Sequence, residues 1–161
     1  MSLRLHLYNA AGQLVGPIAV APVAKSDAEW RVQLTPEQYR ITRSHGTEAA
    51  FCGTLLDNKQ DGVYSCVCCQ LPLFASSDKF DSGTGWPSFV RPITPENVKT
   101  ITDSSYGMTR TEIRCARCQA HLGHVFPDGP PPTRERHCLN SESLHFTVAT
   151  QLASLADAAA G

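Results

Sequence analysis

Two pairs of cysteines, far apart in the chain, constrain the fold more than any other feature. They lie in residues 66–69, CVCC, and in residues 115–118, CARC. Each Cys-x-x-Cys pair presents two thiolates, and four thiolates suit tetrahedral Zn²⁺. The intervening residues 70–114 form a longer segment than the spacing within one small zinc module. The metal would therefore join hairpins that are distant in the chain.

A closed site of four cysteines leaves no coordination position open, so we expect a structural role. The expected cofactor is one Zn²⁺ per chain, bound by Cys66, Cys69, Cys115 and Cys118. Cys68 could replace Cys66 or Cys69, but a two-residue spacing in both pairs favours the first assignment. The alternatives are two redox disulfides, four free thiols, or iron, which four thiolates also suit.

The composition limits the cellular compartment and the classes of partner that we expect. Seven cysteines indicate metal binding or thiol chemistry in a reducing compartment, and the odd number leaves one thiol unpaired. A net charge of -1 gives no basic footprint for nucleic acid or anionic membranes. No apolar run approaches the roughly 18 residues of a membrane span, and the first residues lack the features of a secretory signal. We therefore expect a cytoplasmic protein.

The chain pattern predicts a mainly β protein of one domain. Residues 51–150 hold short apolar stretches such as GVYSC, TEIRC and SLHFTVA, separated by Gly, Pro, Asn and Asp. Such a pattern is typical of antiparallel sheets with long loops. At 161 residues the chain can bury a real core, and we place the catalytic domain at residues 25–150.

The two ends of the chain are expected to lie outside this domain. Residues 1–24 alternate and break at an Ala-Ala-Gly turn, which predicts an N-terminal extension with a hairpin. Two short helices follow, the first capped by Ser26 or Asp27 and the second by Thr35. Residues 151–161 favour a short helix or a frayed tail without a function.

Cys138 is not needed by the metal site, and its neighbours suggest a reactive thiol. Arg134, Arg136 and His137 precede it, and cationic neighbours lower the pKa of a thiol below about 8.5. Strand alternation would place Arg136, Cys138 and Asn140 on one face. This polar row favours a nucleophilic thiolate. The alternative is a small buried hydrophobe, since free cysteines are often buried.

Other polar and aromatic residues could belong to the same site. His121 and His124 lie three residues apart beside the second cysteine pair and could serve as general acids, as further metal ligands or as structural groups. Trp86 follows glycines on both sides of Thr84, which indicates a tight loop. Its indole could receive an apolar or methyl-bearing group, or could simply cap the core.

Three motifs resemble the methionine-R-sulfoxide reductase family, MsrB. They are GWPSF, HLGHVFPDG and RHCLNSESLHF, in the family's order around the two cysteine pairs. The segment TPEQYRITRSHGTE also resembles the family's N-terminal helical segment. The resemblance covers about residues 26–147 and leaves the first 24 residues outside.

This resemblance implies two antiparallel sheets with short N-terminal helices, and zinc on the side remote from catalysis. It implies a peptide-methionine (R)-S-oxide reductase that acts on methionine sulfoxide, free or in oxidised proteins. By resemblance, Cys138 is the nucleophile, Trp86 holds the methyl group of the sulfoxide, and Phe126 also binds substrate. The resemblance further implies that the site is lined by His121, His124, Asn140 and Arg136.

The implied chemistry leaves a sulfenic acid on Cys138, after His124 protonates the sulfoxide oxygen. Many family members carry the resolving cysteine in SGCGWPSF, whereas this chain has Thr84 there. We expect Cys52 to resolve the sulfenic acid, as in some members that resemble this chain, and thioredoxin to reduce the disulfide. Cys68, direct reduction of the sulfenic acid and an uninvolved Cys52 are the alternatives.

Two other classes of function use some of these features. Paired Cys-x-x-Cys motifs also build zinc ribbons that bind nucleic acid or proteins, but the chain has no basic stripe and Cys138 would have no task. A peroxide-reducing thiol enzyme would share the sulfenic acid step, but would not need Trp86 or the paired histidines.

Overall fold

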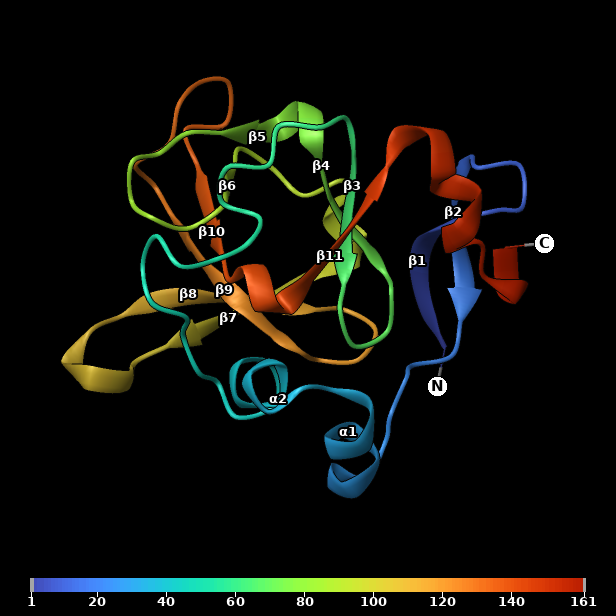
Figure 1. The fold of residues 1–161 in the computed structure, drawn as a ribbon, viewed down its shortest axis with the longest axis horizontal. Coiled ribbons are helices and arrows are strands. Elements are labelled where there is room, and N and C mark those ends of the chain that lie inside the picture. The colour runs from blue at the N-terminus through green and yellow to red at the C-terminus, as the bar shows by residue number, and fades with distance from the viewer. Residues whose placement is uncertain (1, 161) are drawn as a thin grey trace.

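The computed structural model describes residues 2–160, and their fold is mainly β (Figure 1). The strands are β1 (Leu3–Tyr8), β2 (Leu14–Val20), β3 (Gly62–Cys66), β4 (Pro72–Ala75), β5 (Lys79–Phe80), β6 (Ser88–Phe89), β7 (Val98–Asp103), β8 (Arg110–Cys115), β9 (His121–Phe126), β10 (Arg136–Leu139) and β11 (Leu144–Val148). The helices are α1 (Asp27–Gln33) and α2 (Pro36–Thr42). Short 3-10 turns are η1 (Ser76–Asp78), η2 (Pro95–Asn97), η3 (Ser105–Gly107), η4 (Ser141–Ser143), η5 (Ala149–Leu155) and η6 (Ala158–Ala160).

Two antiparallel sheets form the centre of the molecule. One has the strand order β5-β6-β10-β9-β8-β7, and the other has the order β11-β3-β4. This confirms the predicted class of fold. Within the described part of the chain, β1 and β2 form a further antiparallel sheet, which lies beside the turns of the C-terminal residues (Figure 1).

Aromatic side chains join the two central sheets. Tyr64 of β3, Phe74 of β4 and Phe89 of β6 are each 0% exposed. The ring of Phe89 lies 5.1 Å from that of Tyr64 and 4.6 Å from that of Phe74, measured between centroids. Each such side chain stabilises the fold by about 1.5–3 kcal/mol through burial. The core therefore fixes β6, and with it the central strand β10, against the smaller sheet.

The two short helices begin where the sequence predicts. Ser26 caps α1 and Thr35 caps α2, and each cap forms a capping box, with Glu29 and Gln38 respectively. These caps satisfy amide groups that a helix of seven residues would otherwise leave unpaired. Trp30 of α1 is buried. No helix in residues 2–160 is long and apolar enough to cross a membrane.

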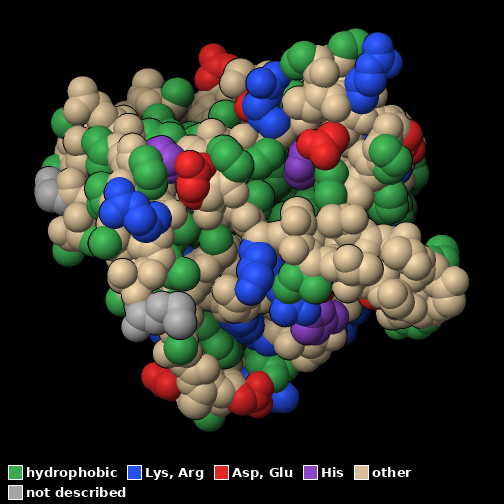
Figure 2. Space-filling view, turned by 180° about the vertical axis from the view of Figure 1, so that it is seen from behind, with side chains coloured by type: hydrophobic (Ala, Val, Ile, Leu, Met, Phe, Trp, Pro, Cys, Tyr) green, Lys and Arg blue, Asp and Glu red, His purple; other side chains and the backbone are tan. Residues whose placement is uncertain are grey.

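The N-terminal strands contribute to the main core. Leu5 and Leu7 of β1 are each 2% exposed and belong to the same buried cluster as Phe89. The division of the chain into residues 1–24, 25–150 and 151–161 stays a prediction. On the face shown in Figure 2, acidic and basic side chains are interspersed, in keeping with the net charge of -1.

Candidate active site and metal centre

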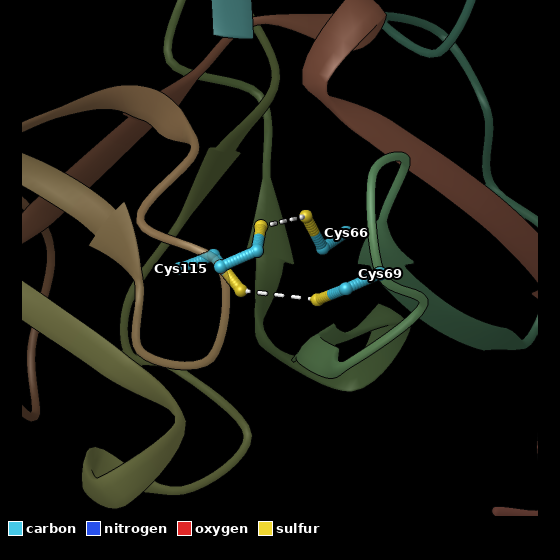
Figure 3. A group of neighbouring side chains, drawn as sticks. Cys66, Cys69 and Cys115 are labelled. Carbon is cyan, nitrogen blue, oxygen red and sulfur yellow. Dashed lines mark hydrogen bonds between the residues drawn. The ribbon is translucent and has the colours of Figure 1, made fainter. Parts of the chain in front are cut away.

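The four predicted metal ligands lie together. Their sulfur atoms are all within 4.8 Å of one another, although the two pairs come from the ends of β3 and β8. The sulfur of Cys66 lies 3.6 Å from that of Cys118, and the sulfur of Cys69 lies 3.4 Å from that of Cys115 (Figure 3). A tetrahedral ion with metal–sulfur bonds of about 2.3 Å needs sulfurs about 3.8 Å apart, so the arrangement fits one such ion.

The same backbone turn shapes both cysteine pairs. Gln70 and Gln119, which directly follow the pairs, have positive φ angles of 64° and 66°. The amide of Gln70 donates to the carbonyl oxygen of Cys66 at 2.8 Å, and that of Gln119 to Cys115 at 2.9 Å. Each turn thus brings its two thiols to one side. Cys68 is buried but lies outside the group of four, so the two-residue spacing describes both pairs.

A second site surrounds Cys138 in the middle of the larger sheet. Its strand, β10, lies between β6 and β9, and Cys138 is directly opposite His124 of β9. A Cβ on Gly123 would lie 1.9 Å from the carbonyl oxygen of Cys138, so only glycine permits this close approach. A cavity of about 250 Å³ opens here. Six predicted site residues line it: Trp86, His124, Phe126, Arg136, Cys138 and Asn140.

The electrostatics of Cys138 differ from the prediction in one respect. Burial raises the pKa of its thiol above the ordinary value, while the charge of Arg136 and a hydrogen bond with Thr84 lower it. The sequence predicted a lowered pKa, because it shows the cationic neighbours but does not show the burial. Of those neighbours, Arg136 acts in the expected direction.

Arg136 is held in place by two groups. Its Nε and Nη2 atoms donate to the two carboxylate oxygens of Asp128 at 3.0 and 3.1 Å. Its guanidinium lies 4.4 Å from the ring centroid of Phe126. This two-point bond and the stacked ring fix the direction of the charge next to Cys138.

Glu48 connects two sides of the cavity through its backbone. Its carbonyl oxygen accepts a hydrogen bond from Nε1 of Trp86 at 3.0 Å, and its amide donates to Oδ1 of Asn140 at 3.1 Å. Asn140 also donates through Nδ2 to the carbonyl oxygen of Leu122 at 3.2 Å. Both polar ends of its side chain are thereby bound to backbone, so Asn140 holds the strands around the cavity. Burial raises the pKa of the Glu48 carboxyl.

His121 and His124 face the same side because β9 contains an irregularity. The pairing with β8 passes from Gly123 directly to His121, so that Leu122 is an extra residue. The two imidazole rings lie 5.4 Å apart. His121 does not line the cavity of Cys138; it lines an adjoining cavity of about 630 Å³, which His124 also lines. Burial lowers the pKa of His121, whose Nδ1 lies 2.6 Å from Glu112.

The carboxylates that orient the histidines carry no recognisable pattern in the sequence. Oδ2 of Asp103 lies 2.9 Å from Nε2 of His124 and 3.3 Å from Nη2 of Arg110. Asp103 and Glu112 come from strands other than that of the histidines, and no local pattern predicts this pairing. Glu48 belongs to the HGTE segment that the resemblance includes, but its role depends on contacts with distant strands.

Cys52 lies outside the cavity, in an exposed position on a neighbouring loop. The preceding residue, Phe51, has a φ of 66°, and its amide donates to the carbonyl oxygen of Gly85 at 2.8 Å. The loop of Cys52 therefore lies against the loop of Thr84 and Trp86. Cys52 and Cys138 are both free thiols in the structure.

The fold and the two cysteine sites define a mainly β thiol protein, with a candidate metal centre separate from the cavity of Cys138. The chain belongs to the SelR domain family, whose model matches residues 34–148. Its relatives include the peptide methionine sulfoxide reductase MsrB of Synechococcus sp. strain RCC307, which is 59% identical over 125 residues, covering 78% of this chain and 92% of that protein. The protein of the same name from Thiobacillus denitrificans is 58% identical over 122 residues, covering 76% and 92%. That of Escherichia coli strain K12 is 57% identical over 122 residues, covering 76% and 89%.

Proposed function

We propose that the protein reduces methionine (R)-sulfoxide, free or in oxidised proteins, to methionine. The observation that carries this proposal is the pairing of Cys138 with His124 on adjacent strands, at a cavity that Trp86 also lines. A nucleophile, an acid and an aromatic surface are what a sulfoxide with a methyl group requires. The names of the relatives supply the substrate class.

The first step moves the sulfoxide oxygen to Cys138. Its thiolate attacks the electron-poor sulfur of the sulfoxide and forms a sulfur–sulfur bond, while His124 donates a proton to the oxygen. The hydroxyl group then passes to the sulfur of Cys138 as the sulfur–sulfur bond and the sulfur–oxygen bond of the substrate break, which leaves a sulfenic acid on Cys138 and releases the thioether, methionine. Arg136 stabilises the thiolate, and Trp86 with Phe126 receives the methyl side of the substrate. Asn140 supports the site from the wall of the cavity, and His121 supports it from the adjoining cavity.

Cys52 completes the cycle in this proposal. Its thiol attacks the sulfenic acid of Cys138, which forms a disulfide and releases water. The contact between Phe51 and Gly85 supports this role, because it holds the loop of Cys52 against the loop that borders the cavity. Thioredoxin then reduces the disulfide with its own dithiol. These reducing steps suit the cytoplasm, which we keep as the proposed location.

The metal that best suits the four cysteines is Zn²⁺, because a closed set of four thiolates is typical of structural zinc sites. Bound there, it would fix the ends of β3 and β8 and would take no part in sulfoxide reduction. The ligands in this proposal are Cys66, Cys69, Cys115 and Cys118.

Reduction of separated R and S epimers of a methionine sulfoxide peptide, with thioredoxin as the reductant, tests the proposed activity. We expect turnover of the R epimer alone. Cys138→Ser should abolish turnover and retain one metal ion per chain. Turnover of the S epimer, or substantial activity of Cys138→Ser, would contradict the proposal.

Peptide mapping after one turnover without reductant tests the role of Cys52. We expect a disulfide between Cys52 and Cys138, and sulfenic acid on Cys138 in a Cys52→Ser variant. A disulfide between Cys68 and Cys138 would instead assign the resolving role to Cys68. Unchanged thioredoxin-driven turnover in Cys52→Ser would remove Cys52 from the mechanism.

A further inference from the structure

Arg117 lies inside the second cysteine pair and contacts both ends of the chain. Its Nη1 atom lies 2.6 Å from Oδ2 of Asp157, in the C-terminal turns. Its Nε atom donates to the carbonyl oxygen of Ala21 at 3.1 Å, and its own carbonyl oxygen accepts from the amide of Val23 at 3.0 Å. One residue of the metal turn therefore binds the N-terminal segment twice and the C-terminal segment once.

The Arg117 side chain is only 12% exposed, and that of Asp157 is 29% exposed. A pair of charges in such a position is costly to separate, because each loses its partner without full access to water. The guanidinium also uses its planar set of donors on two acceptors at once, which holds it in one orientation.

Asn97 provides a second connection between the same parts. Its side chain accepts a hydrogen bond from the amide of His6 and donates one to the carbonyl oxygen of His6, each at 2.9 Å. Its own carbonyl oxygen accepts from the amide of Ala116 at 3.1 Å. Asn97 is 0% exposed. The two residues between Cys115 and Cys118 are thus both connected to the N-terminal segment. Ala116 is connected through Asn97, and Arg117 binds Ala21 and Val23 directly.

The two end segments are also bound to each other. The amide of Asp157 donates to the carbonyl oxygen of Tyr8 at 3.1 Å. The C-terminal turns lie beside β1 and β2 (Figure 1). Residues 3–23 and 149–160 therefore form one unit, named here the strap, and both segments lie outside residues 34–148 that match the family model.

We propose that the strap keeps the second cysteine pair closed and so slows the loss of the bound metal. Release of an ion requires its thiolates to leave one after another, and the turn of Cys115 and Cys118 must open for this. In this chain that movement breaks the contacts of Arg117 with Asp157 and Ala21. The proposal depends on metal binding by the four cysteines and is independent of sulfoxide reduction.

The test measures zinc release from the zinc-loaded chain of residues 1–161 into an excess of the chromogenic chelator 4-(2-pyridylazo)resorcinol. Asp157→Asn removes the charge of the pair at almost constant shape, and we expect release to be about tenfold faster. Arg117→Lys keeps a positive charge but loses the planar donors. Its rate of zinc release should therefore lie between that of the unchanged protein and that of Asp157→Asn. Asp78→Asn is the matched control, because Asp78 pairs with Arg91 at 3.2 Å in η1, and its rate should equal that of the unchanged protein.

Labelling of cysteines by iodoacetamide during release distinguishes local opening from general destabilisation. In Asp157→Asn, labelling should increase first at Cys115 and Cys118, ahead of Cys66 and Cys69. Equal acceleration at all four would mean that the whole fold is weakened, and this would overturn the proposal. An unchanged release rate in Asp157→Asn and Arg117→Lys would also overturn it. Sulfoxide reduction by the zinc-loaded variants should be unchanged, which separates this test from that of the activity.

Discussion

Nε2 of His124 lies 2.9 Å from Oδ2 of Asp103, at the edge of the cavity that contains Cys138. The pKa of the Asp103 carboxyl lies well below its usual range, chiefly because the backbone amide of Ser105 donates to it and also because His124 does. Asp103 is therefore ionised at working pH. A fixed anion at this distance holds the imidazole of His124 in one orientation at the cavity.

Asp103→Asn should lower kcat for sulfoxide reduction by about tenfold to a hundredfold, because His124 loses the group that orients it. KM should change little, since Asp103 is not among the residues that line the cavity of Cys138. A double-mutant cycle with His124→Gln provides the control. If Asp103 acts through His124, the substitution should have almost no further effect in the His124→Gln background, whereas additive losses would contradict this role.

Arg136→Gln should raise the pKa of Cys138 further, because it removes the charge that opposes the effect of burial. Alkylation of Cys138 by iodoacetamide at pH 8 should be several-fold slower, and the rate at high pH should be unchanged. The measurement uses a Cys52→Ser background to avoid labelling of the exposed thiol. Arg134→Gln is the matched control, since Arg134 does not affect the thiol in the structure; an equal effect there would contradict the assignment.

The four metal ligands could be predicted from the sequence because each pair is formed by residues that are close together in the chain. A two-residue spacing is enough to turn two thiols to one side, and the fold then needs only to bring two similar turns together. The shared orientation of His121 and His124 could not be predicted, since regular alternation would place residues three apart on opposite faces. It depends on the extra residue, Leu122, in β9.

The packing of the strap could likewise not be predicted from the sequence. The alternation of apolar residues predicted a hairpin, but not that Leu5 and Leu7 would enter the main core. The contact between Arg117 and Asp157 joins positions 40 residues apart that carry no pattern of their own. Likewise, the burial of Cys138 arises from strands and loops that the local sequence around it does not contain.

Cys115→Ser, or removal of the metal by a strong chelator, should lower the free energy of unfolding by several kcal/mol, because metal binding contributes directly to the stability of the fold. Urea denaturation followed by circular dichroism measures this loss. Cys68→Ser is the control within the same motif as Cys66 and Cys69. It should retain one metal ion and lose only about 1 kcal/mol from burial of a hydroxyl. Loss of the metal in Cys68→Ser, with retention in Cys69→Ser, would reassign the ligand.

His137 makes stability depend on pH. It lies on the face of β10 opposite Cys138, is 4% exposed, and has its ring 5.9 Å from that of Phe74. Burial lowers the pKa of His137 below its ordinary value of about 6.5. Below that value the unfolded chain binds a proton that the folded protein excludes, so stability decreases as the pH falls through about 6.5 toward the folded pKa.

His137→Leu should therefore flatten the dependence of the free energy of unfolding on pH between 7 and 5. One proton contributes at most about 1.4 kcal/mol per pH unit, so the slope should decrease by up to this amount. Urea denaturation at several pH values, with metal content checked at each, gives both slopes. Burial lowers the pKa of His121 as well, so part of the slope should persist in the variant. An identical slope in both proteins would mean that the pKa of His137 is the same in the folded and the unfolded chain, against the expectation from its burial.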